Sequence, residues 1–317
     1  MTLTSVADRS RQIIETLKQV IVGKDEVLER VLLGILANGH ILIEDYPGLA
    51  KTLIARLYAQ VTDLTFKRIQ FTPDLLPSDI TGSFLYNQRE GTFEFRRGPV
   101  FTNLLLADEI NRATPKTQAA LLEVMQEQQI TVEGERFVLE PPFLVIATQN
   151  PLELEGTYPL PEAQLDRFLM RLRVGYPTPS DEREILFRRR QRRQDNVDMP
   201  AAVTRAELLT MQAALEDVFM SEDVEQYIVD VTHATRQDSR VQIGASPRGS
   251  LALMKLARTY AALRGRDFVT PDDVKAMAIP ALAHRLILRP ELWITRVAEE
   301  DIIRDLLNKV PTPTAEA

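Results

Sequence analysis

Short apolar segments of strand length alternate with helix-like patterns from the start of the chain to about Pro177. Continuous apolar runs of this length, separated by helical patterns, are typical of parallel strands buried on both faces. The alternation therefore predicts an α/β domain over residues 1–177, with a parallel sheet covered by helices. The candidate strands are Ile41–Glu44, Lys67–Phe71, Leu104–Asp108, Phe143–Thr148 and Leu169–Val174.

Two stretches inside this region alternate in the way of hairpins that are buried on one face. The paired segments are Phe84–Tyr86 with Phe93–Phe95, and Ile130–Val132 with Phe137–Leu139. We expect two surface β-hairpins inserted between the strands. Phe93 and Phe95 are candidates for a surface that contacts a client protein, although alternating aromatics are also what an ordinary half-buried hairpin shows.

The strand pattern stops at the Pro177–Pro179 break, after which helix-start signals recur. Thr204 and Glu207 have the spacing of a capping box, and Thr270–Asp273 combines a cap, a first-turn proline and early acids. These signals predict a smaller, all-helical second domain over residues 178–310. Residues 311–317 contain prolines and small side chains, and we expect a flexible tail there.

A loop with the features of a phosphate site joins the first strand to a helical pattern. It comprises Asp45, Tyr46, Pro47, Gly48, Leu49, Ala50, Lys51 and Thr52, and Leu53 follows. Such a loop presents backbone N–H groups and a helix N-terminus to phosphates, with a lysine for the outer phosphates and a hydroxyl for Mg²⁺. The strict glycine pattern is broken at Asp45 and Ala50, so the Asp45 carboxylate must point away from a nucleotide. An ordinary strand–turn–helix is the alternative.

Two other strand segments end in polar side chains: Asp108 with Glu109, and Asn150. Open parallel sheets bind ligands along the edge formed by the carboxyl ends of their strands. Asp108 is a candidate Mg²⁺ ligand together with Thr52, and Glu109 is a candidate for orienting the attacking water. Asn150 is placed to hydrogen-bond a γ-phosphate or that water. The alternatives are a helix cap at Asp108 and Glu109, and a turn at Asn150 before Pro151.

Across nearly the whole chain the sequence resembles the MoxR branch of the AAA+ ATPases. Two runs carry the resemblance. The first is Asp108–Arg112, and the second comprises Ala147–Pro151 and Glu155–Phe168, which ends in Leu165-Asp166-Arg167-Phe168. It implies an AAA+ P-loop NTPase core with a five-stranded sheet, a helical lid, and assembly into a ring that is usually a hexamer. It also implies ATP and Mg²⁺ as cofactors.

The same resemblance assigns roles to individual residues. It implies that Lys51 and Thr52 are the Walker A pair, that Asp108 and Glu109 are the Walker B pair, and that Asn150 is sensor 1. Arg167 resembles the arginine finger that is offered to the ATP of a neighbouring subunit.

Two more assignments rest on the resemblance. Arg248, in the helix-start pattern Ser246-Pro247-Arg248, matches sensor 2, and it could serve its own site or a neighbour's. Val22 and Gly23 resemble the stretch that packs beside adenine. The alternatives are a surface arginine and an ordinary loop before a helix.

The function that the resemblance implies is ATP hydrolysis by a ring that remodels or matures partner proteins. The partners it implies are clients or adaptors that bear von Willebrand factor A domains. Three alternatives stay open: a magnesium-chelatase-like motor subunit, a DNA-associated AAA+ loader, and a nucleotide-binding scaffold with little turnover.

Composition bears on partners and location. A formal net charge of −7 argues against nucleic acid as a main partner, because duplex binding draws on a basic surface. We interpret the basic run Arg188–Arg193 as a solvated or inter-subunit helix face. Apolar runs such as Val31–Ala37 are far shorter than the ~18 residues of a membrane span, and the polar start of the chain does not resemble a signal peptide. We therefore expect no membrane span and a cytoplasmic protein.

Overall fold

A computed structural model of the chain describes residues 1–151, 156–294 and 297–313. Glu155, within the second run that carries the resemblance, lies outside the described residues. So do residues 314–317 of the predicted tail.

The first part of the chain forms a five-stranded parallel sheet in the order β2-β5-β8-β1-β9. Every predicted strand is present; Ile41–Glu44 and Leu104–Asp108 have the predicted ends, and the ends of the other three differ from the prediction by one or two residues. The strands are β1 (Ile41–Glu44), β2 (Phe66–Gln70), β5 (Leu104–Asp108), β8 (Leu144–Gln149) and β9 (Met170–Leu172); the helices of this part are α1 (Leu3–Lys18), α2 (Asp25–Leu36), α3 (Lys51–Val61), α4 (Pro77–Thr81), α5 (Pro115–Glu127) and α6 (Glu162–Leu165).

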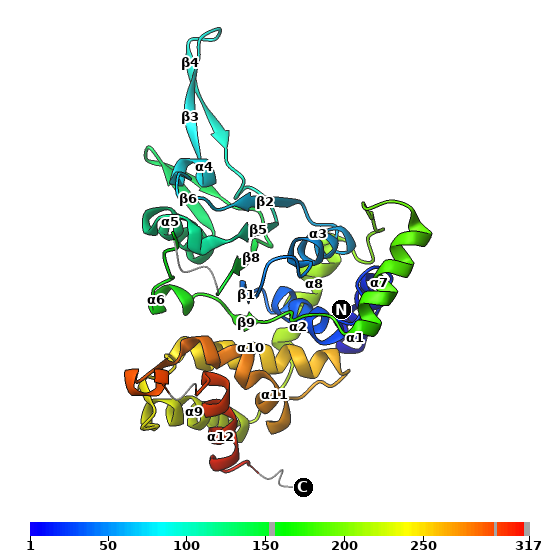
Figure 1. The fold of residues 1–317 in the computed structure, drawn as a ribbon, viewed down its shortest axis with the longest axis vertical. Coiled ribbons are helices and arrows are strands. Elements are labelled where there is room, and N and C mark those ends of the chain that lie inside the picture. The colour runs from blue at the N-terminus through cyan, green and yellow to red at the C-terminus, as the bar shows by residue number, and fades with distance from the viewer. Residues whose placement is uncertain (152–155, 295–296, 314–317) are drawn as a thin grey trace.

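The strands β1, β5 and β8 are buried on both faces, which explains their nearly continuous apolar sequences, whereas the edge strand β2 is largely exposed. Along β5, Leu104 and Leu106 belong to the apolar core that includes α1, α2 and α3, whereas Leu105 and Ala107 belong to the core that includes α5. Figure 1 shows α5 on one side of the sheet and α1–α3 on the other. Alternate side chains of one strand thus anchor the two helical layers.

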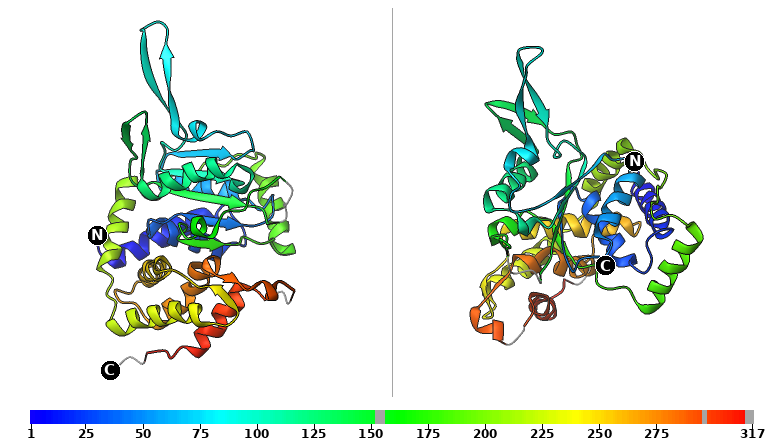
Figure 2. Two further views of the ribbon diagram at one scale, coloured as in Figure 1. Left: turned by 90° about the vertical axis from the view of Figure 1, so that its left-hand side faces the viewer. Right: turned by 45° about the horizontal axis from the view of Figure 1, so that its top comes forward.

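Both predicted hairpins are present. The first joins β3 (Gly82–Asn87) to β4 (Thr92–Arg97), and the second joins β6 (Gln129–Val132) to β7 (Glu135–Val138). The β3–β4 hairpin projects away from the rest of the molecule (Figures 1 and 2).

The two phenylalanines of this first hairpin have different surroundings. The Phe95 ring stacks on Phe137 of the second hairpin, with 4.1 Å between ring centroids. Phe93 is 69% exposed and contacts Tyr86, which is 55% exposed, with ring centroids 5.2 Å apart. Phe95 therefore packs the two hairpins together, and Phe93 and Tyr86 form the exposed aromatic surface.

The second part of the chain is helical, as predicted, and Thr204 and Thr270 begin helices with capping boxes. It also contains one feature that the patterns do not predict, an antiparallel pair of very short strands, β10 (Val241–Ile243) and β11 (Ile287–Leu288). The helices are α7 (Pro179–Arg192), α8 (Arg205–Ala214), α9 (Glu222–Gln237), α10 (Pro247–Leu263), α11 (Pro271–Leu282) and α12 (Glu299–Lys309), with short 3-10 turns at Leu215–Asp217, Ala283–Arg285 and Pro290–Ile294; a further 3-10 turn, Ile110–Arg112, follows β5 in the first part of the chain.

Helices α9–α12 lie together beyond the β9 edge of the sheet, whereas α7 and α8 lie beside the first helices of the chain (Figure 1). Gln212 on α8 donates to the carbonyl of Ile35 at 2.7 Å, and Arg188 on α7 donates to the carbonyl of Lys18 at 2.8 Å. Among the described helices, none combines the length and the apolar character that crossing a membrane requires.

Candidate functional site

The loop between β1 and α3 reaches its shape through two left-handed residues. Gly48 has φ 82°, and Ala50, which is the N-cap of α3, has φ 59° and ψ 18°. A side chain at such a position costs about 1 kcal/mol, which explains why a strict phosphate loop carries glycine there. The sharp turn aims the N-terminus of α3, with its unpaired N–H groups, at the space beside the loop.

Lys51 is held inside this loop by two backbone carbonyls. Its Nζ donates to the carbonyl of Asp45 at 2.7 Å and to that of Tyr46 at 3.0 Å. Partial burial lowers the pKa of the ammonium below 10.5, and the carboxylates of Asp45, Asp108 and Glu109 oppose that shift. An anion placed beside Lys51 would reinforce the charged form.

One cavity of about 430 Å³ brings most of the predicted phosphate-side residues together. Polar ends of β5 and β8 face the loop across it, because both strands end at the same edge of the sheet. Its lining comprises Pro47, Gly48, Leu49, Ala50, Lys51, Thr52, Leu53, Arg68, Asp108, Glu109 and Asn150. Thr52 and Asp108 present hydroxyl and carboxylate oxygens, the donor type that Mg²⁺ prefers, so this lining fits a magnesium ion.

The two carboxylates at the end of β5 are held in a polar network. Asp108 accepts from the Thr148 hydroxyl at 2.6 Å through Oδ1, and from Arg68 at 3.0 Å (Nε) and 2.7 Å (Nη2) through Oδ2. Glu109 Oε2 accepts from Gln70 at 2.6 Å and forms an ion pair with Arg112 at 3.0 Å. The sequence analysis did not predict that Arg68 and Gln70 belong to this site. Their alternation at the end of β2 places both side chains on one face of that strand.

Glu109 has a left-handed backbone, with φ 56° and ψ 50°. Its own N–H donates to the Thr148 hydroxyl at 2.9 Å. A non-glycine residue held in this region is strained, and such strain is typical of functional positions. The backbone therefore turns the Glu109 side chain toward the cavity instead of continuing β5.

A second cavity, of about 330 Å³, lies on the other side of the loop. Val22 lines it, but Gly23 does not, because Gly23 packs against Asp181 at the start of α7. The walls are largely apolar, and three arginines of the basic run face it. The lining residues are Val20, Ile21, Val22, Lys24, Gly48, Leu49, Ala50, Leu53, Ile54, Gly175, Pro177, Ile185, Arg188, Arg189, Arg192 and Asp195.

Gly48 to Ala50 and Leu53 line both cavities. A molecule with a planar apolar end and a chain of phosphates would therefore occupy the two cavities on either side of one loop. This arrangement fits a nucleoside triphosphate. The interpretation of Arg188–Arg193 as a solvated or inter-subunit helix face is incomplete, because Arg188, Arg189 and Arg192 line the apolar cavity.

Two predicted loop residues line neither cavity. Asp45 is only 5% exposed, and its carboxylate accepts from the backbone N–H groups of Tyr46, Val174 and Gly175. The Tyr46 ring stacks on Tyr176, with 5.7 Å between centroids. The Asp45 carboxylate thus points away from the phosphate cavity, as the broken glycine pattern requires.

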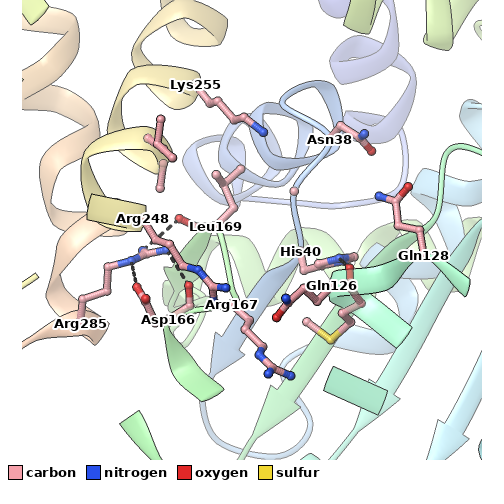
Figure 3. A pocket seen from close by; sticks show the side chains of 14 residues that line it. Asn38, His40, Gln126, Gln128, Asp166, Arg167, Leu169, Arg248, Lys255 and Arg285 are labelled. Atoms are coloured by element: carbon pink, nitrogen blue, oxygen red, sulfur yellow. Dashed lines mark hydrogen bonds and ion pairs between the residues drawn. The ribbon is translucent and has the colours of Figure 1, made fainter. Parts of the chain in front are cut away.

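Arg167 and Arg248 line a third cavity, of about 340 Å³, and neither lines the other two. Figure 3 shows both side chains near Asp166 and Arg285, with Lys255 further along α10. Asp166 accepts from Arg285 Nε and from the Ser246 hydroxyl, each at 2.8 Å. Within the described residues, no hydrogen bond or ion pair engages the guanidinium groups of Arg167 and Arg248, and Arg167 Nε is buried without a partner.

Comparison with known proteins finds two family models that match this chain. Residues 40–170 match the "ATPase family associated with various cellular activities (AAA)", and residues 233–306 match the "AAA lid domain".

Two curated relatives span nearly all of this chain. It is 45% identical to Chaperone MoxR1 of Mycobacterium tuberculosis, over 95% of this chain and 81% of that protein. It is 30% identical to Protein MoxR of Methylorubrum extorquens, over 98% and 97%. A solved structure from Cytophaga hutchinsonii superposes with a TM-score of 0.92 at 41% identity, covering 98% of this chain and 97% of that one.

Proposed function

The chain belongs to the MoxR family of AAA+ ATPases, and from this premise we propose that it hydrolyses ATP with Mg²⁺ in a ring of identical subunits. The observation that carries the proposal is the cavity in which the phosphate loop faces Asp108, Glu109 and Asn150. These residues come from three separate parts of the chain, and each has the chemistry that phosphoryl transfer to water requires.

Each residue of this cavity has a role set by its chemistry. The N-terminus of α3 and the Lys51 ammonium bind the outer phosphates. Thr52 and Asp108 would hold Mg²⁺, which when bound neutralises charge on the phosphates. Glu109 orients the attacking water and accepts its proton, and Asn150 hydrogen-bonds the γ-phosphate or the water without adding charge.

The apolar cavity is the proposed base site. Val22 and Ile185 supply apolar surface from the two segments that enclose it, and Arg189 lies within reach as a cation. An adenine ring there leaves its phosphates beside Gly48, from which the loop leads directly to Lys51.

Arg167 and Arg248 are proposed to act on a neighbour's nucleotide. Both line a cavity separate from their own phosphate cavity, and unpaired like charges gathered in one place favour an anion. The triphosphate of an adjacent subunit supplies that anion if subunits pack head to tail around a ring. A guanidinium is suited to stabilising charge on the transferring phosphoryl group.

The proposed output is the remodelling or maturation of partner proteins. The relative MoxR1 is described as a chaperone, and the β3–β4 hairpin carries Phe93 and Tyr86 on an exposed, projecting surface. A large exposed aromatic pair is suited to protein contact. Clients with von Willebrand factor A domains and a hexameric ring belong to this proposal.

Phosphate release measured from ATP, with and without Mg²⁺, tests the proposal. The parent should turn over ATP only with Mg²⁺. Lys51→Ala should lose nucleotide binding in a fluorescence titration, and the exposed Lys67→Met serves as the matched control. ATP binding without steady-state release would instead support a nucleotide-dependent scaffold. Turnover that rises with DNA in a salt-sensitive manner would support a loader.

A further inference from the structure

We propose that Asp45 is a positioning residue that couples the phosphate loop to the connector, defined as residues 173–178 between β9 and α7. The inference rests on the proposed nucleotide site and assigns a role to the residue that breaks its glycine pattern. Asp45 is not among the lining residues of either nucleotide cavity, so its function is to hold other groups in place.

The Asp45 carboxylate spans the two segments. Its Oδ1 accepts from the N–H of Tyr46 in the loop at 2.8 Å, and its Oδ2 accepts from the N–H groups of Val174 and Gly175 in the connector, each at 2.6 Å. Hydrogen bonds from N–H groups to a buried carboxylate are shorter and stronger than neutral ones. The left-handed backbone of Gly175, with φ 68°, gives the connector a turn here that a residue with a side chain would adopt only with strain.

A lysine binds the same connector through its carbonyls. Lys24 Nζ donates to the carbonyls of Val174, Gly175 and Tyr176 at 3.0, 2.8 and 3.0 Å. One anion therefore holds the N–H groups of this turn, and one cation holds its carbonyls. The stacking of Tyr46 on Tyr176 adds a third link between loop and connector.

The connector lies, along the chain, between Arg167 and the arginines of α7, and both are proposed to contact nucleotide. On one side β9 leads back to Arg167, and on the other α7 carries arginines that line the base cavity. The Lys51 ammonium rests on the carbonyls of Asp45 and Tyr46, which belong to the same peptide segment as the Asp45 carboxylate. When Lys51 turns from these carbonyls to a phosphate, the Asp45–Tyr46 segment, whose Asp45 carboxylate binds Val174 and Gly175, is free to shift.

Asp45 thus transmits the state of the phosphate loop to α7 and to β9, the strand that follows the proposed arginine finger Arg167. Glycine at this position would shape the loop equally well, but it would leave the connector without its anionic partner. The carboxylate thus links the phosphate loop of a subunit to Arg167 of the same subunit, which is the proposed finger for the neighbour's ATP.

The test compares Asp45→Asn and Lys24→Met with Lys67→Met, an exposed lysine outside this network. An asparagine has one acceptor oxygen, and its NH₂ group cannot accept from an N–H. Asp45→Asn should therefore bind a fluorescent ADP analogue about tenfold more weakly, the effect of losing one charge-assisted hydrogen bond. Hydrogen exchange should be faster at the amides of Val174 and Gly175 without nucleotide, and nucleotide should no longer slow exchange in α7.

Lys24→Met should also free the connector while leaving Asp45 intact, so it tests the coupling even if Asp45→Asn does not fold. The proposal is overturned if the variants that fold match the parent in two respects. These are the rate of hydrogen exchange at the connector and the slowing of exchange in α7 by nucleotide. Failure of the parent itself to bind the analogue would instead refute the nucleotide site on which the proposal rests.

Discussion

Removal of the Asp166 carboxylate should destabilise the protein through a buried arginine. The Arg285 side chain is only 3% exposed, and its Nε donates to Asp166 Oδ1 at 2.8 Å. Burial lowers the pKa of the Arg285 guanidinium below its ordinary value, and Asp166 opposes that shift. In Asp166→Ala the guanidinium stays buried without its anion, and the Ser246 hydroxyl at the start of α10 loses its acceptor.

The loss of unfolding free energy in Asp166→Ala depends on the hydrogen-bond acceptors and the solvent that remain near Arg285. Breaking a buried ion pair by removing one partner costs ~3–5 kcal/mol. Arg285 keeps the carbonyl of Phe168 at 2.7 Å as an acceptor, and the Asp166 side chain is itself 19% exposed. These two features favour the lower end of the range, about 3 kcal/mol of unfolding free energy.

Chemical denaturation followed by circular dichroism measures this loss, and a double-mutant cycle assigns it. Asp166→Ala combined with Arg285→Met should be less destabilised than the sum of the single variants, by about 2 kcal/mol. Asp301→Ala breaks an exposed pair with Arg304 and should cost less than about 1 kcal/mol. A loss at Asp166 as small as that of the control, or an additive cycle, would show that Asp166 does not stabilise the buried Arg285.

Three further outcomes are expected. Glu109→Gln should bind ATP in a titration yet release little phosphate, because an amide does not accept the proton of water; unaltered turnover would remove Glu109 from the mechanism. Phe93→Ala with Tyr86→Ala should keep basal phosphate release and lose stimulation by a client, whereas Phe95→Ala should lower the melting temperature; equal melting temperatures would show that Phe95 does not pack the hairpins. Burial lowers the pKa of His40 to about 4, so its neutral ring stabilises the fold fully above the ordinary value near 6.5. About 3 kcal/mol of stability should be lost as pH falls from 6.5 to 4, and a His40→Gln variant that loses as much over that window in denaturation titrations would contradict this.

Local patterns predicted the parts of the fold that local physics decides. The apolar runs predicted β1, β5 and β8 because these strands are buried on both faces, whereas the edge strand β2 is largely exposed. The polar ends of two strands predicted one edge because parallel strands share it. The short pair β10 and β11 left no such signal, since its strands of three and two residues are too short to show a period.

Contacts between distant parts of the chain could not be predicted in this way. Asp45 binds Val174 and Gly175, which lie 129 and 130 residues further along the chain, and no pattern around Asp45 marks them as partners. The separation of Arg248 from its own phosphate cavity likewise depends on how α10 packs, which a capped helix start does not reveal.

Mixing two inactive variants shows whether the proposed ATP site is shared between neighbouring subunits. Lys51→Ala should not bind ATP, and Arg167→Ala should bind it but hydrolyse it slowly, since arginine fingers contribute on the order of 10³–10⁵ in rate. In an equal mixture about a quarter of the interfaces pair an intact phosphate loop with an intact neighbouring finger, if subunits assemble at random around a ring.

Phosphate release should therefore recover to a substantial fraction of the parent rate when the two variants are mixed. A mixture of Lys51→Ala with the double variant Lys51→Ala/Arg167→Ala contains no intact site and should stay inactive. With subunit exchange verified by fluorescence energy transfer, no recovery at any mixing ratio, or a normally active Arg167→Ala protein, would contradict the shared site.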